Sequence, residues 1–249
     1  MARLEFLFAN VREEIDTVAR VAHSFIAPSS IKVLTTLRDN LDRIRESAEG
    51  RVRTWGIPEF QPLCTVTSCG DYACGGGGQR LVFARMSSVW QIEPLGLHNP
   101  GSQRHRKFAL AGLASTKVRI VEGEADVPGD ELAMWRMEIG DDRSPGCCFH
   151  VQVLGESNDA PFPRSVPVPR FPGLFLTPMS VLEFVLAELF QDEWKQHAAS
   201  GSSDMLTWRR IQRKRLASLL HWEEEQVRNS AGAAWTALKS AKPPAELFL

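Results

Sequence analysis

The segment from Thr177 to His197 is the strongest constraint on the fold, because apolar residues occupy almost the whole circumference of the helix it predicts. Thr177 can cap this helix with its hydroxyl group. Pro178 fits the first turn, where the backbone N–H that proline lacks would have no hydrogen-bond partner within the helix. A soluble protein buries such a helix, since each large apolar side chain contributes roughly 1.5 to 3 kcal/mol on burial. We therefore expect a core helix with these apolar side chains: Met179, Val181, Leu182, Phe184, Val185, Leu186, Leu189, Phe190 and Trp194.

Two amphipathic helices are predicted near the N-terminus. Residues 3–26 carry apolar side chains at spacings of three and four, and this helix should end before Pro28. A second helix should be capped by Ser29 or Ser30 and stop near Gly50. The short turn between them predicts an antiparallel hairpin, whose stripe could pack on this chain or on another subunit. The stripe of the second helix consists of Ile31, Leu34, Leu37, Leu41 and Ile44.

Beyond Gly50 the apolar pattern changes to alternation, which is typical of strands. The clearest pair is residues 133–139 and 149–153, where apolar and polar side chains alternate on both sides of a hairpin connection. Residues 94–107 are basic and rich in turn residues, which predicts a surface loop. Further β-branched or aromatic runs predict strands at 63–67, 80–84, 88–92 and 117–121.

The last third of the chain combines a proline-rich segment with helices. Prolines in residues 158–173 favour an extended strap that leads into the core helix rather than a central strand. A further helix should begin near Ser203, with a basic first half and a side formed by Leu206, Ile211, Leu216, Leu219, Leu220 and Val227. The apolar C-terminal residues 247–249 should dock onto the protein.

Segregated helices and consecutive strands indicate an α+β fold. We expect an N-terminal helical hairpin, a central and mainly antiparallel sheet, a buried C-terminal helix and a basic amphipathic helix. Residues 1–50 should form the hairpin. Residues 51–249 should form an α+β domain that packs with the hairpin as one globular unit.

Composition favours a cytoplasmic protein without a global attraction to nucleic acid or to membranes. The formal net charge is -1 and the pI is about 6.6, so any such partner needs a local patch. Charged residues interrupt the N-terminal segment, and no apolar run is long enough for a membrane span. The 5 cysteines, an odd number, do not form a secreted disulfide pattern.

Neither metal nor cofactor binding is predicted from motifs. The spacing of the cysteines departs from the paired spacing of zinc ligands, and buried cysteines that act as small apolar residues are more common. The Gly75–Gly78 run does not match a nucleotide-binding motif and precedes a strand, which favours a flexible hairpin loop. The cysteines considered as ligands, together with His150, are Cys64, Cys69, Cys74, Cys147 and Cys148.

Register of the predicted hairpin suggests one catalytic hypothesis. If apolar positions face each other, Glu138 opposes His150 and Arg136 opposes Gln152. Glu138 could then orient His150, leaving the second ring nitrogen for a substrate, as in a His-dependent hydrolase or nuclease. Arg136 or Arg170 would stabilise developing negative charge. The alternative is a ladder of polar cross-strand pairs that stabilises the sheet.

A second hypothesis concerns nucleic acid. Trp208 and a cluster of five cations share one predicted helix, and residues 104–107 add a second basic run. A solvated helix face is the alternative, because three glutamates follow on the same helix. The cations of the cluster are Arg209, Arg210, Arg213, Lys214 and Arg215.

No enzyme signature accompanies these features, so the leading hypothesis is a non-catalytic binding or assembly protein. It would dock through helical surfaces onto a protein partner or a second copy of the chain. Nucleic-acid binding through the basic helix and hydrolysis at His150 are the alternatives.

Overall fold

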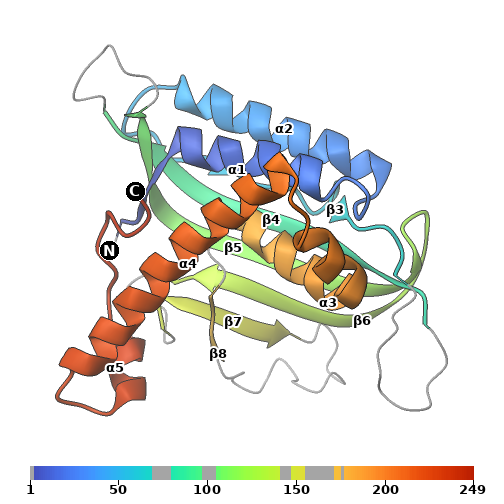
Figure 1. Ribbon diagram of the computed structural model, residues 1–249. Helices are drawn as coiled ribbons and strands as arrows, with labels where there is room; N and C mark the ends of the chain where they lie inside the picture. Colours follow the sequence, from blue (N-terminus) through green and yellow to red (C-terminus); the bar gives the residue numbers. More distant parts are fainter. Residues whose placement is uncertain (1–2, 69–79, 97–104, 141–146, 155–170, 175–176) are drawn as a thin grey trace.

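The helices and the sheet form two layers in the computed structural model of the chain (Figure 1). The structure describes residues 3–68, 80–96, 105–140, 147–154, 171–174 and 177–249. These residues contain helices and one antiparallel 8-stranded sheet, which confirms the predicted α+β class. The described helices are α1 (Phe8–Val21), α2 (Pro28–Arg45), α3 (Pro178–Ala198), α4 (Ser203–Asn229) and α5 (Ala234–Ser240).

Long antiparallel strands form the centre of the sheet. Its order is β2-β4-β5-β6-β7-β8, while β1 pairs with β5 and β3 pairs with β4. One face packs against the helices and the other is rich in polar side chains, as is common in antiparallel sheets. The strands are β1 (Glu5–Leu7), β2 (Arg53–Trp55), β3 (Leu63–Cys64), β4 (Val82–Pro94), β5 (Lys107–Glu124), β6 (Val127–Ile139), β7 (Phe149–Leu154) and β8 (Phe171–Pro172).

Helix α3 is the predicted core helix. Thr177 caps it, because the Thr177 hydroxyl accepts a hydrogen bond from the Ser180 backbone N–H at 3.2 Å, and Pro178 lies in the first turn. Gln191 interrupts the helix with a φ of 36°, an uncommon value for a residue with a side chain. Beyond this kink, the ring centroid of Trp194 lies 5.1 Å from that of Phe25. The last turns of α3 are thereby packed against the end of the helical hairpin.

At the N-terminus, the predicted helix over residues 3–26 is partly wrong. Residues 5–7 form β1, and α1 covers only Phe8–Val21. Leu4, Phe6 and Phe8 are buried while the residues between them are half-buried, so alternation outweighs the helical spacing in this segment. Pairing of β1 with β5 supplies the backbone hydrogen bonds that the first helical turn would have made.

Helix α2 starts and ends earlier than predicted. Ala27 is its N-cap and Pro28 occupies the first turn, whereas Ser30 exchanges hydrogen bonds with the Cys64 backbone at 2.7 and 2.8 Å. The helix ends at Arg45 rather than near Gly50. Buried side chains of both helices of the hairpin belong to the same core cluster as the sheet, α3 and α4. The hairpin stripe therefore packs onto this chain's own core.

Strand prediction was more accurate for pairing than for length. The runs predicted at 80–84 and 88–92 fall in one strand, β4, apart from residues 80–81, and β2 had not been predicted. The register of β6 and β7 is confirmed at every predicted pair. Most of the predicted strap and the middle of the 94–107 loop lie outside the described residues. No helix in the described ranges is long and apolar enough to cross a membrane.

Candidate functional site

Helix α4 combines the predicted basic cluster with two open flanks. Ser202 caps it by accepting a hydrogen bond from the Met205 backbone N–H at 3.3 Å. Met205, Trp208, Leu219 and Trp222 are buried and fix one side of the helix on the core. Helix α4 is 27 residues long and crosses the helical layer beside α1 (Figure 1).

The cations of the predicted basic cluster do not form one open surface. Arg210 pairs with Glu13 of α1 at 2.8 Å, and Arg209 donates to the Ser200 carbonyl oxygen. Lys214 donates to the backbone oxygen of Leu249 at 3.2 Å, and Arg215 pairs with the buried Glu14. Arg213 is the cation of this cluster without a bond to any residue that the structure describes. Nucleic-acid binding by the cluster stays a prediction.

The second basic run makes similar internal contacts. Arg106 donates to the Ser47 carbonyl oxygen at 2.8 Å, and Lys107 pairs with Glu5 at 3.0 Å. Arg104 lies outside the described residues. The described part of this run therefore contacts β1 and the residues that follow α2.

Glu14 and Arg215 form a buried ion pair that joins three helices. Glu14 is 0% exposed and Arg215 is 8% exposed. The Thr177 hydroxyl donates to the other carboxylate oxygen of Glu14 at 2.6 Å. The pair thus links α1, α4 and the N-terminus of α3. The sequence offered one signal for it, since Glu14 lies between Val11 and Val18 on the apolar side of its helix.

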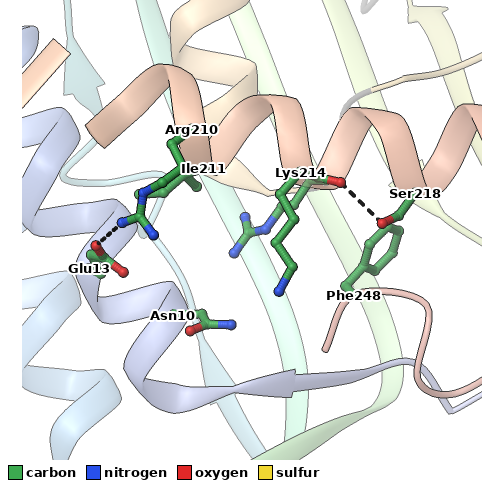
Figure 2. A pocket seen from close by; sticks show the side chains of 8 residues that line it. Asn10, Glu13, Arg210, Ile211, Lys214, Ser218 and Phe248 are labelled. Carbon is green, nitrogen blue, oxygen red and sulfur yellow. Dashed lines mark hydrogen bonds and ion pairs between the residues drawn. The ribbon is translucent and has the colours of Figure 1, made fainter. Parts of the chain in front are cut away.

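A small cleft lies between α1 and α4 (Figure 2). Asn10 and Glu13 of α1 face Arg210 and Lys214 of α4, and Phe248 of the C-terminal segment closes one end. Its volume is about 100 Å³. Ile211, Arg215 and Ser218 complete the lining. Two of the predicted nucleic-acid contacts, Arg209 and Arg213, are outside this cleft.

The opposite flank of α4 carries an apolar stripe. Leu206, Leu216, Leu220 and Val227 are 54%, 39%, 45% and 38% exposed, whereas Leu219 is buried. The prediction of one apolar side with all of these residues is therefore wrong. Separations of four, seven and fourteen residues place the four exposed side chains on the same side of the helix. We call these four residues the α4 stripe.

Glu138 and His150 lie opposite each other on β6 and β7, as the predicted register requires. Oε2 of Glu138 is 3.2 Å from Nε2 of His150, and Nε of Arg136 is 3.2 Å from the other Glu138 oxygen. Arg136 also donates to the side-chain oxygen of Gln152 at 3.1 Å. These groups point away from the helical layer, since the alternate residue Trp135 contacts Phe184 of α3.

The second ring nitrogen of His150 is already occupied. Nδ1 lies 2.9 Å from the Cys147 carbonyl oxygen, and the ring is 1% exposed. Both ring nitrogens of His150 therefore lie within hydrogen-bond distance of an oxygen atom of this chain. A catalytic role would require one of these bonds to open. It stays a prediction, and Arg170 lies outside the described residues.

The charge on Glu138 is favoured by its neighbours. Burial alone would raise the pKa of Glu138, but the hydrogen bond with His150 and the positive charge of Arg136 outweigh this effect and lower the pKa. The same contacts are those of a stabilising cross-strand ladder. Arg136 and His150 thereby hold the Glu138 carboxylate in its charged form.

The predicted cysteine set is only partly described. Cys69, Cys74 and the Gly75–Gly78 run lie outside the described residues, while Cys64 and Cys147 are thiols. Burial raises the pKa of both thiols, which disfavours the thiolate. Within the described ranges, no group of three His, Cys, Asp or Glu side chains could hold a metal ion.

Comparison of the chain with family models, characterised proteins and solved structures finds no match. A functional argument for this chain therefore depends on the chemistry of its surfaces. The two flanks of α4 offer that chemistry most clearly: a stripe of exposed apolar residues on one side and a cleft rich in cations on the other.

Proposed function

We propose that this protein is a non-catalytic assembly protein that pairs with a second copy of itself through the α4 stripe. The single observation that carries this proposal is the exposure of Leu206, Leu216, Leu220 and Val227 on one side of a 27-residue helix. Scattered apolar side chains are normal on protein surfaces, but a contiguous row favours an interaction site.

The charge distribution along α4 favours a second copy over an unrelated partner. Arg209 and Arg213 flank the first half of the stripe, and Glu223 and Glu224 flank the second half. Two such helices in antiparallel orientation place the basic half of each beside the acidic half of the other. This is the self-complementarity that an interface with two-fold symmetry needs.

A specific register follows from the positions. If the two-fold axis crosses α4 at the level of residue 218, Leu216 of one copy faces Leu220 of the other. In the same register Arg213, which has no bond to any described residue of its own chain, faces Glu223. Burial raises the pKa of Glu223, and an opposing guanidinium would stabilise its charged form. The apolar and ionic pairs thus agree on one alignment.

Sedimentation over a range of concentrations tests the proposal. We expect the natural chain to form a dimer and Leu220→Glu to raise the dissociation constant at least about tenfold, because two charges enter an apolar contact. Leu113→Glu is the matched control, since Leu113 on β5 is 47% exposed, nearly as much as Leu220 at 45%, and lies outside the stripe. A monomer at all concentrations would overturn the proposal.

Charge reversal tests the register. Arg213→Glu should weaken the dimer because each new carboxylate faces Glu223 of the other copy. Adding Glu223→Arg on the same chain should restore it, since the two partners are then exchanged. If the double variant remains as weak as Arg213→Glu, the antiparallel alignment is wrong even if a dimer forms.

A further inference from the structure

The cleft between α1 and α4 has the composition of a small anion site. Arg210, Lys214 and Arg215 contribute three positive charges, while Glu13 and Glu14 contribute two negative ones. Glu14 is fully committed to Arg215 and Thr177. Among the described residues, Lys214 is the cation of this set that no side-chain carboxylate pairs with.

Several donors toward the cleft remain available. The Lys214 ammonium has three N–H groups and uses one on the Leu249 backbone oxygen at 3.2 Å. The side-chain amide of Asn10 makes no hydrogen bond to any residue in the described ranges. Figure 2 shows Asn10 and Lys214 directed into the same gap between the two helices. The Leu249 oxygen already lies within hydrogen-bond distance of the Lys214 ammonium, so there is room for an oxygen atom beside this group.

The cleft is large enough for a small anion. Its volume of about 100 Å³ is several times the roughly 10 to 15 Å³ that one water molecule needs on the same measure. A tetrahedral oxyanion fits such a space, and its oxygens can accept hydrogen bonds from an ammonium and an amide donor together. Ile211 and Phe248 form the apolar part of the wall, beside the charged groups. They would contact an organic group attached to the anion.

We propose that the α1–α4 cleft binds the phosphate group of a small phosphomonoester. Lys214 and Asn10 donate hydrogen bonds to the phosphate, and Phe248 contacts the organic part. Arg210 and Arg215 provide the surrounding positive potential while they keep their carboxylate partners. This site is on the opposite flank of α4 from the stripe, so the inference is independent of the proposed dimer.

Calorimetric titration of the full chain with inorganic phosphate and with phenyl phosphate tests the site. Both should bind saturably, and phenyl phosphate should bind more tightly because its ring can contact Phe248. Equal affinities for the two compounds would show that Phe248 does not contact an organic group, and that part of the proposal would be wrong. A parallel titration with chloride at matched ionic strength should give no saturable binding, since simple screening is not a site. Absence of saturable phosphate binding overturns the proposal.

Variants locate the binding. Lys214→Met should weaken phosphate binding at least about tenfold, because it removes a charged hydrogen bond. Lys195→Met, at an exposed lysine of α3 outside the cleft, removes the same charge and should leave binding unchanged. If both variants weaken binding equally, only net charge is responsible and the assignment is wrong.

Two further variants keep the test decisive if Lys214→Met disturbs the C-terminal segment. Asn10→Asp preserves shape but places a negative charge against the anion, so it should weaken binding. Glu13→Gln removes a carboxylate from the rim and should strengthen binding. Effects in the opposite directions would contradict the site, whatever the behaviour of Lys214→Met.

Discussion

At the scale of single residues, Glu138 shows how neighbours decide the state of a half-buried charge. Its pKa is lowered although burial acts in the other direction, because His150 and Arg136 interact with both of its oxygens. A carboxylate with a lowered pKa in the folded state contributes stability above its unfolded value of about 4.5. That contribution is lost as the pH falls through the lowered folded value.

Glu138→Gln should therefore destabilise the protein at neutral pH, by about 1.5 to 3 kcal/mol for a lost charged hydrogen bond. The difference between the variant and the natural chain should shrink in acid, where the natural carboxylate becomes protonated. Denaturant unfolding at several pH values between about 3 and 7 measures both free energies. A difference that stays constant across this range would mean that the Glu138 charge does not act in folding.

The sequence predicted this pair because the register of a hairpin follows from its alternating apolar residues. If Met137 faces Val151, the residue opposite His150 must be Glu138, and the structure has this pair. The second contact of His150, to the Cys147 carbonyl oxygen, had no such signal. It depends on the path of the backbone just before β7, which side-chain patterns do not specify.

At the scale of elements, the buried Glu14 and Arg215 pair explains how three helices are held in one arrangement. One carboxylate oxygen of Glu14 pairs with Arg215 of α4, and the other accepts a hydrogen bond from Thr177 at the cap of α3. Burying charges is costly, and removing one partner leaves the other without compensation. The pair is therefore a point where one substitution affects α1, α3 and α4 together.

Glu14→Gln should lower the free energy of unfolding by about 3 to 5 kcal/mol, because Arg215 is left buried without a counter-charge. Glu13→Gln is the matched control on the same helix: its pair with Arg210 is exposed, so the cost should be about 1 kcal/mol or less. Denaturant unfolding of the three proteins gives both differences. Similar costs at the two positions would show that burial does not set the value of this pair.

Helix α3 could be predicted from sequence because its cap, its proline and its apolar residues all indicate the same element. The N-terminal segment gave a wrong prediction for residues 5–7, since Leu4, Phe6 and Phe8 fit alternation while Leu4, Leu7 and Phe8 fit a helix. Pairing with β5, which lies a hundred residues away, decides between them. Such a long-range contact is not readable from one local pattern.

At the scale of the whole molecule, the two ends of the chain meet on the same side of the core (Figure 1). The backbone N–H of Glu5 donates to the Ala245 carbonyl oxygen at 2.8 Å. The sequence predicted that the apolar C-terminal residues dock, and Phe248 is buried as expected. Where they dock could not be predicted, because the site combines β1 and β7 with α4.

The α4 flanks illustrate the same limit for the candidate sites. The sequence located the basic cluster, but not which cations would be used within the chain, because Glu13, Glu14 and Leu249 come from distant segments. Helical periodicity alone also assigned Leu219 and Leu220 to one side, although one is buried and the other exposed. Tertiary packing chooses the buried arc of a helix that has apolar residues on more than one side.

Phe248→Ala tests whether the C-terminal segment is part of the folded core. The Phe248 ring centroid lies 5.6 Å from that of Phe6 and 6.0 Å from that of Phe149, and the side chain is 5% exposed. Truncation should leave a cavity between β1 and β7 and lower the free energy of unfolding by about 3 to 5 kcal/mol. Phe60→Ala should change it by less than about 0.5 kcal/mol, because Phe60 is 89% exposed. Denaturant unfolding followed by tryptophan fluorescence measures both values, and a cost at Phe248 as small as that at Phe60 would show that the C-terminal segment is detached in solution.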